Sequence, residues 1–253
     1  MIDEGGVGAK GMHEAFHQSL IDVQSEVRAA FEWSVASDRT SAEAMVACVA
    51  NHAAMIPSWR NSERNLTLDQ LRAALLAAKE VVVLGAAITE SEVESIDMDG
   101  RLIIAADGSV GALSDRSKLA CVVSDFDGGV HLNGAAEQGT VMIVHAHGDN
   151  SVRWVECLNT WSQCPTPPRL ILTHQTPEVL SNAHNFGGFT DGDRAVCFAL
   201  AMGVAKENIR LVGFALNRVG IWSATTVAER KLEKLVWMNR ILTSVGLDDA
   251  VAK

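Results

Sequence analysis

The sequence predicts an α/β protein in which a mostly parallel β-sheet follows an N-terminal helical segment. From residue 80 onward the chain contains short apolar runs rich in β-branched residues, at 81–84, 102–105, 119–123, 141–144, 170–172 and 209–212. Helix-compatible stretches separate several of these runs, and this alternation is typical of parallel strands buried on both faces. With 253 residues, 48% of them hydrophobic, the chain is long enough for one large domain with a buried core.

The helices expected before the sheet occupy residues 10–79. Apolar residues recur there at three- and four-residue steps, first at Phe16, Leu20, Val23, Val27 and Phe31, and again at Met45, Val49 and His52. The polar stretch 61–65 follows Pro57 and predicts a linker, and Thr67 is a candidate N-cap for a helix that ends at Ala78. We therefore divide the chain into a helical segment, 1–66, and an α/β domain, 67–253.

Two further helices are expected in the second half of the chain. An apolar helix over 195–201 follows Thr190 and Asp191, either of which could cap it. An amphipathic helix over 226–242 closes the chain, with the motif E-R-K-L-E-K-L at 229–235.

Charge and cysteine content limit the classes of partner and the compartment. The net charge of −10 opposes general affinity for nucleic acid or anionic membrane, yet is compatible with a phosphate ligand held through a divalent cation. Five cysteines form no C-x-x-C pair, which favours a reduced cytosol and inert thiols. The first ten residues lack the features of a signal peptide, and no apolar run approaches 18 residues, so we expect a cytoplasmic protein.

Glycine or polar residues follow five of the expected strands, beginning with Gly85 after the first strand. In a doubly wound sheet, ligands bind beyond the carboxyl ends of the strands. One Asp-Gly pair alone is more often a turn, and one histidine alone is more often structural, but five such strand ends in succession favour an active site. The candidates are Asp107, Gly108, Asp125, Asp127, His145, His147, Asp149, Asn150, Thr173, His174 and Gln175.

The chemistry of these residues indicates a hard cation. Asp125 and Asp127 are two apart on a segment expected to be extended, so their carboxylates point to the same side and repel unless a proton or cation lies between them. Residues 107–193 contain ten acidic and four basic residues. Carboxylates with few cysteines suit Mg²⁺, which retains waters and binds substrate phosphates.

A glycine-rich loop before the helix at 195–201 forms a second constellation. Gly187 and Gly188 allow backbone N–H groups to approach a ligand, and a helix N-terminus can bind phosphate. Arg194 would orient such a phosphate. The alternative for Asp191 and Asp193 is a loop with an acidic N-cap.

Several motif matches point elsewhere. The G-x-G-x-x-G at residues 6–11 follows no strand and is rejected as a dinucleotide site, and no P-loop occurs. The run from His145 to Asn150 lacks the last histidine of the H-x-H-x-D-H motif of metallo-β-lactamase-like hydrolases. The motif D-F-D-G at 125–128 resembles the opening motif of haloacid dehalogenase-like phosphatases, with Asp125 as nucleophile, but two strands precede it; this reading is kept as an alternative.

Four motifs taken together, in this order, carry a more specific resemblance. A-D-G at 106–108, S-D-F-D-G at 124–128, H-A-H-G-D-N at 145–150 and G-G-F-T-D-G-D-R at 187–194 resemble the archaeal MptE-like family of 6-hydroxymethyl-7,8-dihydropterin pyrophosphokinases. The likeness spans residues 81–242 and includes the terminal K-L-E-K-L. It implies a Rossmann-like catalytic domain over 67–253, related to thiamin pyrophosphokinase.

The resemblance also implies an activity: Mg²⁺-dependent transfer of diphosphate from ATP to the pterin hydroxymethyl group, with release of AMP. Small-molecule substrates are then the expected partners, nucleic acid and membrane are not, and a homodimer is left open. The implied catalytic residues are Asp125, Asp127, Asp149 and Arg194, and the implied metal ligands are Asp125, Asp127, Asp149, Asp191 and Asp193. The implied substrate-binding positions are Gly85, Asp107, Gly108, His145, His147, Asn150, Gln175, Gly187, Gly188 and Thr190.

One departure from the family pattern concerns the first strand. The family has a G-x-G-P-S-like loop there, whereas residues 85–91 lack the second glycine and the proline, which leaves open a nucleotide-binding protein without turnover. Pterin recognition usually needs an aromatic platform. Without tyrosine, the candidates are Phe126, Phe186, Phe189, Phe214, Trp154, Trp161 and Trp222.

Overall fold

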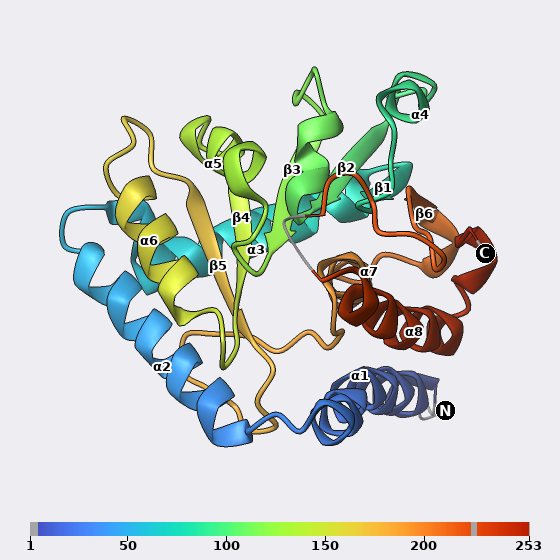
Figure 1. Cartoon of the computed structure of the whole chain (residues 1–253), viewed down its shortest axis with the longest axis horizontal. Helices are drawn as coiled ribbons and strands as arrows, with labels where there is room; N and C mark the ends of the chain where they lie inside the picture. The colour runs from blue at the N-terminus through green and yellow to red at the C-terminus, as the bar shows by residue number, and fades with distance from the viewer. Residues whose placement is uncertain (1–4, 224–226, 253) are drawn as a thin grey trace.

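A six-stranded, all-parallel sheet forms the centre of the computed structural model, which describes residues 5–223 and 227–252 (Figure 1). The strand order is β5-β4-β3-β2-β1-β6, and every neighbouring pair is parallel. The strands are β1 Glu80–Leu84, β2 Arg101–Ala106, β3 Leu119–Ser124, β4 Val141–Ala146, β5 Arg169–His174 and β6 Ile209–Val212. The α/β class and all six expected strands are confirmed.

Helices precede, connect and follow these strands. The α-helices are α1 Gly5–Phe31, α2 Val35–His52, α3 Asn61–Ala77, α4 Glu90–Glu94, α5 Gly129–Glu137, α6 Ser151–Trp161, α7 Asp191–Ala201 and α8 Ala228–Val245. Short 3₁₀ turns occupy η1 Pro57–Trp59, η2 Asp107–Ala112, η3 Lys206–Asn208 and η4 Asp248–Ala250. No described helix is long and apolar enough to cross a membrane.

Both faces of the sheet are buried, which explains the continuous apolar runs of the strands. Along β1, Val81 and Val83 enter one core cluster, whereas Val82 and Leu84 enter the other. Helices α1, α3, α7 and α8 contribute buried residues to the first cluster, and α2, α5 and α6 to the second. Alternation of side chains across a strand thus supplies two separate cores.

The first two helices pack on opposite faces of the sheet. Leu20, Val23 and Val27 of α1 belong to the first core cluster, and Met45 and Val49 of α2 belong to the second. In Figure 1, α1 lies beside α8 and α2 lies beside α6. The side chain of Phe16, expected on the apolar face of α1, falls outside the described side chains.

The expected linker at 61–65 and the expected end of the last helix at residue 242 are wrong. Residues 61–65 are not a linker: α3 begins at Asn61, directly after the 3₁₀ turn at Pro57–Trp59, and Thr67 is buried within it. Position 66/67, where we divided the chain, therefore falls inside a helix. The last helix begins at Ala228 and continues to Val245, ending on left-handed Gly246; residue 226 lies outside the described residues.

The strand order places a crevice beside β1. From β1 the chain proceeds outward to β5 and then returns to β6 on the other side of β1, so that Val83 pairs with both Ile104 and Leu211. The helix after β1, α4, contributes Val93 to the second core cluster, whereas the helix after β6, α8, contributes to the first, so the chain leaves these neighbouring strands toward opposite faces of the sheet. Such a switch point is where open α/β sheets bind ligands.

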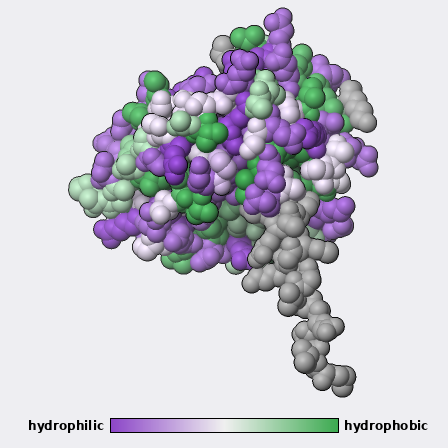
Figure 2. Space-filling view, turned by 90° about the horizontal axis from the view of Figure 1, so that it is seen from below, coloured by the Kyte–Doolittle hydropathy of each residue, from purple (hydrophilic) through white to green (hydrophobic). Residues whose placement is uncertain are grey.

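The surface mixes polar and apolar residues, and the cysteine thiols are unpaired and unreactive. Figure 2 shows hydrophilic and hydrophobic residues interspersed over the face seen from below. All five cysteines are free. Burial raises the pKa of the Cys157 thiol to about 11 and that of Cys121 further, as expected for inert thiols.

Candidate active site

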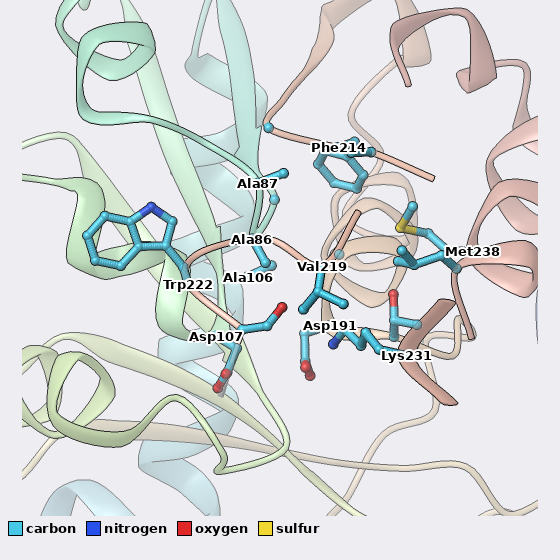
Figure 3. A pocket seen from close by; sticks show the side chains of 18 of the residues that line it. Ala86, Ala87, Ala106, Asp107, Asp191, Phe214, Val219, Trp222, Lys231 and Met238 are labelled. Carbon is cyan, nitrogen blue, oxygen red and sulfur yellow. The ribbon is translucent and has the colours of Figure 1, made fainter. Parts of the chain in front are cut away.

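Three carboxylates from different elements meet at the carboxyl edge of the sheet. Asp107 follows β2, Asp127 follows β3 and Asp191 is the first residue of α7, and each offers one oxygen within 4.8 Å of the others. Figure 3 shows Asp191 beside Lys231 at the cavity, with Asp107 on the other side of Asp191 in this view. The sequence grouped Asp107 with substrate-binding positions; the structure brings it into the carboxylate group.

The local backbone holds this geometry. Ser124 Oγ donates a hydrogen bond to Asp107 Oδ1 and accepts one from the Phe126 N–H at 2.8 Å. Phe126 has a positive φ of 74°, so the segment is turned rather than extended, contrary to expectation. Gly128 is required because a Cβ there would lie 2.8 Å from Asp107 Oδ1.

Burial and mutual repulsion dominate the electrostatics of the carboxylate group. Burial raises the pKa of Asp191 to about 8, with repulsion from Asp125 and Asp127 adding to it. Burial and neighbouring carboxylates likewise raise the pKa of Asp107 well above its ordinary value, and that of Asp127 to a smaller extent. A divalent cation would remove this repulsion, and an all-oxygen donor set suits Mg²⁺.

A second acidic group is built around His147. Its Nε2 lies 3.3 Å from Asp125 Oδ2, and its Nδ1 contacts Asp149 Oδ1. Burial opposes a charge on His147, yet hydrogen bonds to the two carboxylates raise its pKa to about 9. The same hydrogen bonds lower the pKa of Asp149 to about 2 and hold that of Asp125 well below its usual range despite burial. At neutral pH His147 is a cation between two anions.

A central cavity joins the two groups. It has about 470 Å³ of empty space and includes Asp125, Asp127, Asp191, His147, Arg194, Lys231, Lys234 and Trp33. Asp125 and Asp127 thus share a cavity, as expected, although the turn at Phe126 brings this about. Asp125 Oδ1 and Asp191 Oδ1 are buried without a hydrogen-bond partner among the described residues, and Asp191 Oδ1 has only a 3.6 Å ion-pair contact with Arg194, so both oxygens can accept a bond from a ligand or ion.

The basic side chains of the cavity come from two helices. Arg194, in the first turn of α7, lies 3.6 Å from Asp191 Oδ1 and is buried. Lys231 and Lys234 are three residues apart on α8 and project from the K-L-E-K-L motif. Four basic groups including His147 therefore face the carboxylates, as a bound polyphosphate requires.

A buried hydrogen-bond network connects the N-terminal helices to Arg194. Asp38 accepts hydrogen bonds of 2.8 Å from the Gly148 N–H and from Gln175 Nε2. Gln175 Oε1 in turn accepts from Arg194 Nη2 at 3.0 Å, and its backbone carbonyl accepts from Arg28 Nη1 at 2.6 Å. Sequence reasoning identified Gln175 and Arg194 but missed Arg28 and Asp38, which no motif marks.

Other predicted positions support the site from within the fold. Asn150 Nδ2 donates to the backbone carbonyls of Asp125 and His145, so it ties two strand-end loops together. His145 is buried between Thr173 Oγ1 at 3.0 Å and Gln175 Oε1 at 3.3 Å. His174 is buried as well and contacts Thr176 Oγ1 at 2.9 Å.

The glycine-rich loop before α7 is closely packed. Gly187 and Gly188 both have positive φ, and a Cβ on them would lie 2.8 Å from Leu20 and from Arg194 respectively. Thr190 and Asp193 form a capping box in which Asp193 Oδ1 accepts the N–H groups of Phe189 and Thr190. Asp193 therefore serves the start of α7 and is not one of the group of three carboxylates, whereas Asp191 is; the N-cap residue itself is Thr190 rather than an acid.

A larger cavity of about 570 Å³ lies at the switch point. Its lining includes Asp107, Asp127, Asp191 and Lys231 together with residues of the loops after β1 and β6; Asp107, Asp191 and Lys231 are labelled in Figure 3. Gly85 and Gly108 allow close backbone approach here, since their Cβ atoms would lie 2.5 Å from Gly213 O and 2.3 Å from Trp222 O. The β6 loop, 213–223, was missed because no recognisable motif marks it.

Most aromatic candidates for a platform are core residues. Phe126, Trp154 and Trp161 are buried in the second cluster. Trp222 borders the switch-point cavity, but its indole N–H donates to Ile88 O at 2.8 Å and its ring packs edge-on against His131. Trp33, at the junction of α1 and α2, was not anticipated and lines the central cavity.

A parallel sheet whose switch point carries clustered carboxylates opposite basic side chains defines a class, the α/β proteins that handle phosphorylated ligands at the carboxyl edge. Comparison with known proteins agrees. A *Pyrococcus furiosus* 6-hydroxymethyl-7,8-dihydropterin pyrophosphokinase is 38% identical over 173 residues, which cover 65% of this chain and 71% of the relative. The chain belongs to the 6-hydroxymethyl-7,8-dihydropterin pyrophosphokinase family.

Two shorter matches carry the same name. The *Methanothermobacter thermautotrophicus* relative is 40% identical over 46% of this chain and 47% of its own length. The *Methanocaldococcus jannaschii* relative is 36% identical over 42% of this chain and 44% of its own length. No family model matches the chain. The names favour diphosphate transfer over the phosphatase alternative.

Proposed function

We propose that the protein transfers diphosphate from ATP to 6-hydroxymethyl-7,8-dihydropterin, giving AMP and the pterin diphosphate. The observation that carries this proposal is the meeting of Asp107, Asp127 and Asp191 with Arg194 and Lys231 at the switch point of the sheet. Membership of the pterin pyrophosphokinase family supplies the acceptor. Both substrates are small molecules.

Asp107, Asp127 and Asp191 would hold Mg²⁺. Their oxygens converge within 4.8 Å, and their raised pKa values reflect a repulsion that a cation offsets. When bound, the ion neutralises charge on the phosphates. Asp125 and Asp149 would act on this site through His147 or through water, and Asp193 would fix the start of α7.

The nucleotide would occupy the switch-point cavity of the Rossmann-like domain. That position gives its phosphates access to Lys231, Arg194 and the carboxylate-bound ion. The altered loop after β1 is hydrogen-bonded to β6 and its loop, with Gly85 N–H to Val212 O at 2.8 Å and Ala87 N–H to Gly213 O at 2.9 Å. It would therefore shape the cavity by close packing, even without the proline of the family pattern.

The transfer needs positioning and charge neutralisation. The acceptor hydroxyl oxygen bonds to the β-phosphorus of ATP, and the bond from that phosphorus to the oxygen bridging the α-phosphate breaks. AMP leaves with that oxygen, and the hydroxyl proton passes to water. Arg194, Lys231 and Lys234 would stabilise the transferred group, because a loose phosphoryl-type transition state asks mainly for electrostatic stabilisation.

Product analysis of wild-type protein and an Asp127→Asn variant tests the function. With ATP, Mg²⁺ and the dihydropterin, wild type should form AMP only when the pterin is present, and the variant should lose about 10²-fold or more in rate. Orthophosphate from a phosphomonoester would instead support the phosphatase alternative. ATP binding without pterin-dependent AMP would support a nucleotide-binding protein without turnover.

A further inference from the structure

A third cavity lies where the N-terminal helices meet the H-A-H-G-D-N loop. This junction cavity has about 540 Å³ of empty space, and its lining combines the end of α1, the start of α2 and the loop after β4: Glu32, Trp33, Ser34, Ser37, Asp38, His147, Gly148 and Asp149. None of the functional residues assigned above comes from residues 32–37. The proposed function therefore assigns no role to the junction cavity.

The three cavities lie in a row in which neighbouring cavities share lining residues. The switch-point cavity shares Asp127, Asp191 and Lys231 with the central cavity. The central cavity shares Trp33 and His147 with the junction cavity. A transfer reaction needs its donor and acceptor on opposite sides of the group that moves. The row offers this arrangement, with the carboxylates and basic side chains in the middle.

We propose that the junction cavity binds the planar heterocycle of the acceptor, with Trp33 as its stacking platform, so that the N-terminal helices supply acceptor recognition. This inference rests on the proposed diphosphate transfer. The acceptor's hydroxymethyl group would pass His147 to reach the central cavity, where the diphosphate of ATP meets it from the switch-point side.

Trp33 is held as a rigid aromatic wall. Helix α1 ends at Phe31; Glu32 follows with a left-handed φ of 55°, and the Trp33 N–H donates to Arg28 O at 2.9 Å. The indole stacks on Phe31 with ring centres 5.0 Å apart and packs against Phe189 at 5.8 Å. Lys234 Nζ and Arg230 Cζ also lie over the Trp33 ring, 5.5 and 5.8 Å from its centre, so a stacked heterocycle would displace these flexible side chains. The contacts with Phe31 and Phe189 fix the ring in place, and it lines both cavities.

The charges of the two adjoining cavities differ in sign. The junction cavity has three carboxylates, those of Glu32, Asp38 and Asp149, against the single cation of His147. The central cavity instead sets four basic groups, those of Arg194, Lys231, Lys234 and His147, against the carboxylates of Asp125, Asp127 and Asp191, which a bound cation would offset. A wall rich in carboxylate oxygens repels phosphates, but these oxygens can accept hydrogen bonds from the N–H-bearing edge of a neutral pterin ring. Charge therefore assigns the heterocycle to the junction and the phosphates to the centre.

Binding and kinetics of three variants test this assignment. Trp33→Ala should weaken binding of 6-hydroxymethyl-7,8-dihydropterin, measured by calorimetry, and raise its KM about tenfold, while the KM for ATP stays within about twofold. Trp33→Phe should restore most of the affinity. Ser37→Leu, which fills the same cavity from an exposed position, should weaken pterin binding without weakening ATP binding.

The matched control is Trp237→Ala. Trp237 lies on α8 beside Arg240 and lines none of the three cavities, so its removal should leave the pterin KM unchanged. Unchanged pterin affinity in both Trp33→Ala and Ser37→Leu would overturn the inference while wild-type turnover keeps the proposed function. Wild type that neither binds the pterin nor forms AMP from ATP would overturn both.

Discussion

The carboxylate of Asp38 accepts a 2.8 Å hydrogen bond from the side-chain amide of Gln175, although 137 residues separate them in the chain. The bond joins the first turn of α2 to the residue that follows β5. Through the other end of the same amide it also reaches Arg194. The N-terminal helices are thereby fastened to the residue expected to orient phosphate.

Removing the charge of Asp38 should destabilise the fold. Arg28 Nη1 lies 3.8 Å from Asp38 Oδ2, and both side chains are buried, so Asp38→Asn leaves a buried guanidinium without its counter-charge. We expect the free energy of unfolding in urea to fall by about 3 kcal/mol. Glu26→Gln, in an exposed ion pair with Arg240, is the control and should cost less than about 1 kcal/mol. Equal losses in the two variants would argue against the network.

Neutralising one member of the carboxylate group should stabilise the metal-free protein and weaken its binding of Mg²⁺. Asp191→Asn removes a buried like charge, so the metal-free variant should unfold at a higher temperature than wild type at pH 8. Wild type should gain thermal stability from Mg²⁺, and the variant should lose most of that gain. Thermal unfolding with Mg²⁺ and with EDTA measures both effects. A full Mg²⁺ response in the variant would exclude Asp191 as a ligand.

Metal-free protein should lose stability as the pH rises from 6.5 to 9. The folded pKa of His147, about 9, exceeds its ordinary 6.5, so its contribution is complete below pH 6.5 and disappears as the pH passes through 9. Asp191, with a folded pKa of about 8, acts in the same direction. We expect a loss of about 2 kcal/mol by urea denaturation in EDTA. His147→Gln should flatten this slope; an unchanged slope would refute the role of His147.

Replacing Arg194 with lysine should lower the rate of AMP formation. Its guanidinium reaches Gln175 and Asp191 together, and a lysine ammonium cannot reproduce that planar geometry. Arg194→Lys should lower kcat for AMP formation by about 10² with the fold intact by circular dichroism. Arg210→Lys, at an exposed position on β6, is the matched control and should retain full activity.

The sequence predicts those features whose evidence is local along the chain, and it misses those that depend on tertiary contacts. The strands were predictable because burial on both faces makes each one a continuous apolar run, as in Val81–Leu84. The start of α3 was not, because the polar residues after Asn61 resemble a linker until the helix packs. Membership of Asp107 in the carboxylate group depended on β2 and β3 being neighbours. Trp33 and Asp38 have no motif, and only the tertiary fold brings them to the site.

Product stoichiometry tests the central claim most directly. ATP, Mg²⁺ and 6-hydroxymethyl-7,8-dihydropterin should be mixed with the protein and the products followed by phosphorus NMR and chromatography. Attack at the β-phosphorus predicts AMP and pterin diphosphate in equal amounts, with both absent when either substrate is omitted. Formation of ADP with a pterin monophosphate, or no AMP at all from folded protein, would contradict the claim.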